Sequence, residues 1–585
     1  MSCIGMDEIQ KTQRSFARKA EREPEHRFED LYHLLYRKEW VEAALDKVLG
    51  NPGSRTAGVD GITRQAFAKA GYRERFVAEL RADIRAGTYR PQPVRRHWIP
   101  KADGRKRPLG IPVIRDRVVQ MMLKMLLEPI WESDFLPCSH GFRPERRTMD
   151  CIAQCFRLIY PQKGYYWVIE GDITGCFDHI QHEKLLELVA RRVADVRVLK
   201  LIRQMLEAGV MEGELFKKTE GGTPQGGIVS PLLANIYLHE LDLWWWRRWG
   251  KLSRGQRCYR RRVKNESNAM LVRYADDFIL LYNGTKSQAE EIRAALRTFL
   301  DEELHLELNE EKTRLAHATD GFDFLGFNVR LYEDGEKKPH LRVKPSAKNV
   351  QRFRAQIRQM TCKRRVFDPE IEKIQAINQL CRGWVSYYQH VSAKETAREL
   401  DYWVFLRVLG WFQRKHRKGP RWVWNEYVSG EKTEHHDRTN IGVCGRDGQT
   451  LHLCKMTDQP ITLYRQRKHQ NPYLESGCAT GIQNIESDSP LALQTWIGWT
   501  RHNARAELRA EALKRDGHRC ARCGATENLV VHHKKPWARG GDDELENLET
   551  LCQNCHHQEP VPTRGTGRRK RQSRDATSKR RGKAG

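Results

Sequence analysis

The chain has 585 residues, more than one hydrophobic core normally supports, so several domains are expected. Hydrophobic residues make up 39% of it, which excludes a fully disordered chain. Lysine and arginine outnumber the acids by 28, which favours a polyanionic partner such as nucleic acid over a merely solvated basic surface.

The cellular compartment is indicated by what the sequence lacks. The first residues, Met1 to Glu8, show no basic segment followed by an apolar stretch, which predicts no secretory signal. No uninterrupted apolar run approaches the roughly 20 residues that span a bilayer. The sequence therefore predicts a cytoplasmic protein without a membrane partner, in which paired cysteines bind metal rather than crosslink.

The expected elements follow in chain order. Residues 1–44 are charged and have apolar residues at helical spacing. A loop is expected at 51–61 and a helix at 63–85. From about 90 to 330, strand-like apolar runs alternate with helical segments, which predicts an α+β or α/β body. Helical periodicity with many basic and tryptophan residues returns at 345–430.

Two strand patterns end in acidic residues. Leu271–Tyr282 reads LVRYADDFILLY, which predicts a β-hairpin with Asp276 and Asp277 at its turn. Tyr166–Ile180 reads YWVIEGDITGCFDHI, which predicts a strand that ends at Asp172. An Asp-Asp turn alone is usually structural, but two strands can bring three carboxylates to one point. Hard oxygen ligands of this kind suit Mg²⁺.

The ordered set of motifs resembles the reverse transcriptases, and among them the group II intron-encoded type. The motifs that carry the resemblance are NPGSRTAGVDG (51–61), IPKADGRKRPLGIP (99–112), SHGFRP (139–144), the two acidic strands, GGTPQGGIVSPLLANIYLHELD (221–242), LNEEKT (308–313) and GFDFLGF (321–327). The resemblance covers almost the whole chain and implies an RNA-directed DNA polymerase.

The resemblance implies roles for individual residues. Asp172, Asp276 and Asp277 are expected to hold two Mg²⁺ ions that activate a primer 3′-hydroxyl and stabilise the departing pyrophosphate. Lys101 and Arg107 match residues that clamp the incoming triphosphate, and two solvated surface charges are the alternative.

Three further residues match the nucleotide site. Phe177 corresponds to a bulky gate that excludes a ribose 2′-hydroxyl, and an ordinary core phenylalanine is an equal alternative. Gln225, in a glycine-rich loop, corresponds to a residue that steadies the templating pair. Lys312 is expected either to protonate pyrophosphate or to serve as a structural cation.

The helical segment resembles the maturase, or thumb, segment of the same family at Ile377–His390 and Leu409–Trp424. Basic residues interleaved with aromatics suit RNA, because cations follow phosphates and rings stack on bases. A thumb whose aromatics form its core is the alternative. The basic residues expected to bind RNA include Arg414, Lys415, Arg417 and Lys418. Ile461–Ser476 resembles a basic stretch that contacts the DNA target.

The end of the chain has two CxxC pairs. Cys520, Cys523, Cys552 and Cys555 have the spacing of a tetrahedral Zn²⁺ site, and soft thiolates favour Zn²⁺ over Mg²⁺. The sequence therefore predicts a structural zinc site.

Histidines around the cysteines resemble the HNH nucleases, whose fold is a ββα-metal unit. The resemblance implies that His533 is the general base, that His532 and His556 bind the catalytic divalent metal, and that Asn547 orients the histidine loop. His557 can replace or assist His556. A plain zinc ribbon with incidental histidines is the alternative.

Together these features predict a multidomain α+β protein that serves a mobile intron by reverse transcription, by assisting splicing, and by nicking the target strand to prime DNA synthesis. The expected domains are a helical extension (1–44), reverse transcriptase fingers and palm (45–335), a helical thumb or maturase domain (336–430), a DNA-binding segment (431–500), an HNH domain (501–560) and a basic disordered tail (561–585).

The expected partners are the intron RNA, the target DNA and deoxynucleoside triphosphates, in the bacterial cytoplasm and at the nucleoid. The alternatives are a bacterial reverse transcriptase with retron-like or defence duties and a catalytically silent RNA-binding splicing factor. The maturase-like and HNH segments argue against the first, and the three intact aspartates argue against the second.

Overall fold

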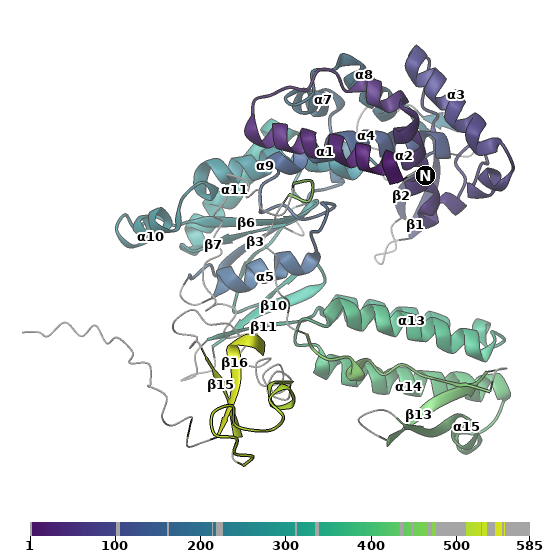
Figure 1. The fold of residues 1–585 in the computed structure, drawn as a ribbon, viewed down its shortest axis with the longest axis vertical. Coiled ribbons are helices and arrows are strands. Elements are labelled where there is room, and N and C mark those ends of the chain that lie inside the picture. The colour runs from purple at the N-terminus through teal and green to yellow at the C-terminus, as the bar shows by residue number, and fades with distance from the viewer. Residues whose placement is uncertain are drawn as a thin grey trace, which may run out of the picture. The chain divides into compact units, whose positions relative to one another are not determined.

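In a computed structural model, the chain divides into two compact units, residues 1–493 and 494–585 (Figure 1). The structure describes residues 3–100, 106–160, 163–212, 215–217, 226–309, 313–333, 339–432, 437–445, 448–462, 464, 471–474, 511–527, 529–534, 545–552 and 555. Within these ranges, no helix has the length and apolar character needed to cross a bilayer.

The first unit begins with helices gathered around one buried helix. α1 (Cys3–Arg22) and α2 (Lys38–Gly50) pack against α4 (Ile114–Asp134), whose residues are mostly buried. The single helix expected at 63–85 is wrong in part, because α3 spans only Tyr72–Ala86. Gly71, with a left-handed φ of 69°, separates α3 from a short 3₁₀ turn.

The central sheet of the first unit has the order β6-β7-β3-β8 and is antiparallel. Its strands are β3 (Trp167–Gly171), β6 (Ala269–Tyr274), β7 (Asp277–Tyr282) and β8 (Leu315–His317). Five successive residues of β6 are buried, because helices and loops cover both faces of the sheet, and this explains the continuous apolar run there.

The helices of this body are α5 (Thr148–Ile159), α6 (Cys176–His179), α7 (His182–Ala190), α8 (Val196–Leu206), α9 (Ser230–Trp245), α10 (Arg254–Arg262) and α11 (Lys286–Leu304). A second sheet has the order β2-β1-β4-β5, with β1 (Val94–Pro100), β2 (Lys106–Ile111), β4 (Val210–Glu212) and β5 (Leu215–Lys217).

A helical segment follows a small sheet of β9 (Phe322–Phe324), β10 (Phe327–Tyr332) and β11 (His340–Pro345). Its helices are α12 (Ala347–Met360), α13 (Glu370–Tyr388), α14 (Lys394–His416) and α15 (Pro420–Tyr427). The next strands, β12 (Val428–Lys432), β13 (Asp437–Cys444) and β14 (Thr450–His452), form a sheet that packs on α13 and α15.

The chain then returns to the N-terminal body of the first unit through Tyr464 and residues 471–474, here named the return segment. The Tyr464 hydroxyl donates to Asp150 Oδ1 on α5 at 2.8 Å. Asn471 Nδ2 donates to Ser133 Oγ on α4 at 3.0 Å, and the Tyr473 hydroxyl donates to Glu128 Oε2 on α4 at 2.7 Å. These contacts join residues more than 300 positions apart into one unit.

The second unit is small. Residues 511–515 are helical, and β15 (Leu529–His533) pairs antiparallel with β16 (Leu548–Cys552). Asp516 links the helix to the hairpin, because its Oδ2 accepts a hydrogen bond from the Thr550 backbone N–H at 2.9 Å.

Candidate functional site

The strand register brings the three predicted carboxylates to one edge of the central sheet. Gly171, the last residue of β3, is paired with Phe278, so Asp172, which follows it, lies opposite Asp277. In the hairpin, Tyr274 pairs with Asp277, which places Asp276 in the turn. Asp172 and Asp276 are half-buried and Asp277 is exposed.

Close backbone packing shapes this edge. A Cβ atom on Gly171 would lie 2.1 Å from the Phe278 ring, so only glycine fits before Asp172. A Cβ atom on Gly141 would lie 2.2 Å from the Ala275 backbone nitrogen. Ala275 has a left-handed φ of 58°, an uncommon conformation for a residue with a side chain. The segment around Gly141 therefore holds the acidic turn at van der Waals contact.

Arg273, which the sequence reasoning did not single out, is fully buried just before the turn. Its guanidinium group donates to Asp242 Oδ1 at 2.8 Å, to the Ala275 carbonyl at 2.9 Å and to Ser139 Oγ at 2.8 Å. It also donates to Asn235 Oδ1 at 3.0 Å. One buried side chain thus links the turn to α9 and to the residues before Gly141.

Arg273 and Asp242 form a fully buried ion pair. Burial alone raises the pKa of Asp242, but the neighbouring guanidinium outweighs it and leaves the pKa of this carboxyl below its ordinary value. The signal in the sequence was a charged residue inside an apolar strand. Asp242, the partner of Arg273, lies 31 positions earlier and is the last residue of the motif at 221–242.

Phe177 lies in the same neighbourhood as the carboxylates. It sits on α6, which follows Gly175 with a left-handed φ of 52°. Its ring is 9% exposed and meets the Phe142 ring edge-on, with centroids 6.5 Å apart. Burial, and then the nearby charge of Asp276, raises the pKa of the adjacent Cys176 thiol.

The remaining nucleotide-site residues are not placed. Lys101, Gln225 and Lys312 lie outside the described residues, and of Arg107 only the backbone, on β2, is described. The oxygen atoms of Asp172, Asp276 and Asp277 do not form a compact group of metal ligands in the structure. Within the described ranges, only the four cysteines of the second unit form such a group.

The helical segment presents arginines around one indole ring. The guanidinium carbons of Arg354, Arg358 and Arg407 lie 5.7, 5.6 and 6.0 Å from the centre of the Trp403 ring. Among the described residues, Arg354 Nε and Arg407 Nε are buried without a hydrogen-bond partner. Three cations gathered around one ring are suited to an anionic ligand.

The basic residues predicted at the end of α14 differ in their surroundings. Arg414 donates to the Thr361 carbonyl at 2.9 Å, and Lys415 donates to the Asp368 carbonyl at 2.9 Å. Burial, and then the charge of Arg407, lowers the pKa of Arg414. The other two predicted residues, Arg417 and Lys418, are exposed.

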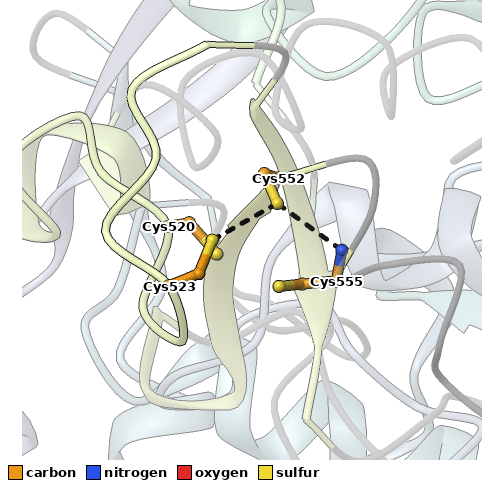
Figure 2. A group of neighbouring side chains, drawn as sticks. All are labelled: Cys520, Cys523, Cys552 and Cys555. Atoms are coloured by element: carbon orange, nitrogen blue, oxygen red, sulfur yellow. Dashed lines mark hydrogen bonds between the residues drawn. The ribbon is translucent and has the colours of Figure 1, made fainter.

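The four predicted cysteines of the second unit converge on one point. Figure 2 shows Cys520, Cys523, Cys552 and Cys555 facing one another, and their sulfur atoms all lie within 4.8 Å of one another. A tetrahedral ion with bonds of about 2.3 Å separates its sulfur ligands by about 3.8 Å, so the set fits Zn²⁺.

The backbone prepares at least one of these thiols for metal binding. Burial raises the pKa of Cys520, but backbone N–H groups of Cys523, Cys552 and Arg522 outweigh it and lower that pKa to about 6. The Cys555 N–H also donates to Cys552 Sγ at 3.5 Å. A thiolate is the form that binds a metal.

The predicted nuclease residues are placed only in part. His532 lies on β15 opposite Glu549. Asn547 directly precedes β16, and its carbonyl accepts a hydrogen bond from the Lys534 N–H at 2.8 Å. The backbone of His533 ends β15, its side chain is not described, and His556 and His557 lie outside the described residues.

Comparison with family models defines the class of protein. Reverse transcriptase (RNA-dependent DNA polymerase) matches residues 99–329, the maturase-specific domain of group II introns matches 350–428, and HNH endonuclease matches 520–560. The chain is thus an RNA-directed DNA polymerase and an HNH endonuclease joined by a maturase domain.

Known relatives specify the family. Protein YkfC of Escherichia coli is 39% identical over 343 residues, which cover 55% of this chain and 88% of YkfC. The group II intron-encoded protein LtrA of Lactococcus lactis is 34% identical over 367 residues, which cover 55% of this chain and 60% of LtrA. Nuclear intron maturase 2 of Arabidopsis thaliana is 28% identical over 273 residues, covering 36% of this chain and 37% of that protein. The chain belongs to the multifunctional group II intron-encoded proteins.

Proposed function

We propose that the protein nicks a DNA target with its HNH domain and copies intron RNA into DNA from the 3′-hydroxyl of the nicked strand. The observation that carries the proposal is the register that brings Asp172, Asp276 and Asp277 to one sheet edge, in a chain that also contains a nuclease domain. The bacterial relatives support a site of action at DNA in the bacterial cytoplasm.

The first unit then acts as a right hand. The central sheet is the palm, the β1–β2 hairpin belongs to the fingers, and α12 to α14 form the thumb. Mg²⁺, when bound by the three aspartates, supplies the charge that activates the primer hydroxyl and stabilises pyrophosphate. Arg273 contributes by fixing the turn, so that the carboxylates need little reorganisation.

The incoming nucleotide is expected between the fingers and the carboxylate edge. Lys101 and Arg107 are assigned to its triphosphate, Gln225 to the templating pair and Lys312 to the pyrophosphate. The edge-on contact of Phe177 with Phe142 supports a rigid wall, which a steric gate against a ribose 2′-hydroxyl requires.

The maturase role is assigned to the helical segment. The arginines around Trp403 are held close together by the packing of α12 on α14, and an RNA phosphate backbone would neutralise them. Arg417 and Lys418 extend this surface, whereas Arg414 and Lys415 also hydrogen-bond to carbonyl groups of the protein. Binding there would stabilise the folded intron RNA.

The second unit is proposed to be a ββα-metal nuclease with Zn²⁺ at its four cysteines. His532 and His556 are assigned to the catalytic divalent metal, His533 to general base catalysis and Asn547 to orientation of the histidine loop. The hydrogen bond from Lys534 to the Asn547 carbonyl supports the last assignment, because it ties Asn547 to the residue after His533.

Contact with the DNA target is proposed for Arg465, Arg467 and Lys468, which lie between the two parts of the return segment and outside the described residues. The tyrosines on either side are anchored on α4 and α5, which supports a fixed starting point for this basic stretch.

The test is primer extension on an RNA template by Asp276→Asn, with Asp320→Asn as the matched control. Asp320 is an exposed aspartate of the same unit beyond β8. Loss of a metal ligand removes several kcal/mol of stabilisation, so extension should fall at least about 100-fold, while RNA binding and splicing support persist. Extension at the wild-type rate by Asp276→Asn would remove the aspartates from the active site.

A further inference from the structure

A cavity of about 570 Å³ opens in the first unit between α5, α10 and the start of β6. Six basic residues line it: Arg157, Lys163, Arg254, Arg257, Arg261 and Arg262. None of the described residues that line it is acidic. A cavity of this size accommodates a nucleotide.

The cavity is separate from the carboxylate edge. It is lined by Asn268, Met270 and Leu271 around the start of β6 and by Asn283 just after β7, away from the turn at Asp276, and none of the three aspartates lines it. Three strand steps of about 3.4 Å, or about 10 Å, separate Leu271 from Tyr274, the last residue of β6 before the turn. A ligand in this cavity therefore does not occupy the polymerase site.

One residue that lines the cavity, Asn268, has an unsatisfied acceptor. Asn268 is 1% exposed, and its Nδ2 donates to the Arg257 carbonyl at 3.2 Å, which fixes the orientation of the amide. Its Oδ1 has no hydrogen-bond partner among the described residues. Beside it lie the apolar groups of Leu158, Trp245 and Met270. A buried acceptor without a donor is costly, and an N–H group of a ligand would satisfy it.

The rim of the cavity is built for close contact between its two sides. Arg261 Nη1 donates to the Lys163 carbonyl at 2.6 Å. The neighbouring Gly164 has a left-handed φ of 67°, and a Cβ atom there would lie 2.7 Å from Arg261 Nη2. Glycine thus permits the arginine to approach the backbone and to bridge the rim.

The positive charge extends beyond the cavity. Between 247 and 264 the chain has nine basic residues and no acid: Arg247, Arg248, Lys251, Arg254, Arg257, Arg260, Arg261, Arg262 and Lys264. The next acid, Glu266, pairs with Arg260 at 3.2 Å. A surface of this extent exceeds what a small anion needs and suits a polyanion.

We propose that this cavity binds one unpaired nucleotide of an RNA strand. The arginines of α10 contact the phosphates on both sides of that nucleotide, and its base lies against the apolar wall and donates an N–H to Asn268 Oδ1. Single-stranded RNA is recognised in this way, by cations on the backbone and by hydrogen bonds to the base. The choice of RNA rests on the proposed function.

The test compares two triple variants of the full chain. Arg254→Gln/Arg261→Gln/Arg262→Gln removes three charges from α10. Lys286→Gln/Arg293→Gln/Arg297→Gln removes three charges from α11, whose sequence is also rich in acids. The probe is a labelled single-stranded RNA of mixed sequence and about 20 nucleotides, titrated at several salt concentrations beside a DNA of the same sequence. The α10 variant should lower the salt slope for RNA by about 2, at about 0.7 per phosphate contact, and the α11 variant should leave it unchanged.

Photocrosslinking with 4-thiouridine in the same RNA locates the contact. A crosslink in the peptide that contains residues 254–271, lost in the α10 variant, supports the site. The proposal would be overturned if the salt slope for RNA were unchanged in the α10 variant, or if the crosslinks were confined to other segments. It would also be overturned if the salt slope for DNA fell as much as the salt slope for RNA. Primer extension on the same preparations separates the two proposals. If the wild type extends the primer and the α10 variant binds RNA normally, the proposed nucleotide site is wrong and the proposed polymerase function is retained. If the wild type does not extend, the proposed function fails independently.

Discussion

Arg273 is fully buried on β6, and its guanidinium group joins the acidic turn to α9 and to Ser139. Its four hydrogen-bond partners are spread over more than 130 positions of the chain. A buried ion pair of this kind contributes little net stability compared with apolar groups, but breaking it leaves an unpaired charge in the interior. The arrangement therefore fixes the geometry of the turn.

Arg273→Met should lower the free energy of unfolding by about 3–5 kcal/mol, because Asp242 stays buried without its partner. The double variant Arg273→Met/Asp242→Asn should recover part of that loss, since the unpaired charge is removed. Chemical denaturation of the full chain followed by tryptophan fluorescence measures both. If the double variant is no more stable than the single one, lost packing rather than lost pairing explains the effect.

At the scale of single residues, the sequence predicted the position of acidic residues that lie at the end of an apolar strand or in a turn. Asp172, Asp276 and Asp277 each close a strand or occupy a turn, and the register brings them to one edge, while their role in metal binding stays a prediction. Arg273 was missed because its partners are distant in sequence and a periodicity argument treats it as an exception in an apolar strand. The role of Phe177 stays a prediction, because a buried ring fits both a steric gate and an ordinary position in the core.

At the scale of elements, local spacing was the strongest guide. Each CxxC pair places two thiols on one turn, so only the pairing of β15 with β16 was needed to bring the four cysteines together. The sheet of β12, β13 and β14 was not anticipated, because β12 and β14 are short and the first half of β13, Asp437 to Asn440, is polar. Its position depends on Asn378, which donates to the His452 carbonyl and accepts from the Cys454 N–H.

Cys552→Ser should abolish zinc binding and loosen the second unit, since structural zinc binding is coupled to folding. His533→Ala should retain zinc and the fold but lose nicking by roughly a hundredfold to ten-thousandfold, because its assigned role is proton transfer. Bound zinc, nicking of a DNA target and primer extension are measured on the same preparations, and primer extension should survive both changes.

Cys444→Ser is the matched control, because Cys444 is an exposed cysteine of the first unit. It should leave all three measurements unchanged. Loss of zinc from His533→Ala would show that the division between ligand and base is wrong. Normal nicking by His533→Ala would show instead that the domain is a zinc ribbon with structural histidines.

At the scale of the whole molecule, the return segment could not be predicted. Tyr464, Asn471 and Tyr473 contact residues 314 to 345 positions earlier, and no local pattern encodes such partners. The sequence indicated only a basic stretch for DNA, and that role stays a prediction. The structure adds that Tyr464, Asn471 and Tyr473 contact α4 and α5.

A chain that ends after residue 476 should keep the stability and primer extension of the first unit, whereas one that ends after residue 458 should lose stability. Tyr473→Phe should cost about 1–2 kcal/mol, because Glu128 loses a half-buried hydrogen bond. Tyr427→Phe is the matched control, since its hydroxyl donates to Glu370 within the helical segment.

Thermal unfolding and limited proteolysis of residues 459–470 measure the effect. Cleavage there should increase in Tyr473→Phe and not in Tyr427→Phe. Equal cleavage in the two variants, or equal stability of the two truncated chains, would show that the return segment is not needed to hold the first unit together.

The return segment also sets the order of events during synthesis. Ser133 leaves the ribosome 338 residues before its partner Asn471. At about 5–20 residues per second, α4 waits roughly 20–70 s with this surface open to water and to other chains. The polymerase body therefore cannot be completed while it is being translated, and it closes only when the ribosome has nearly reached the nuclease. A nascent chain released before that point keeps this surface of α4 exposed.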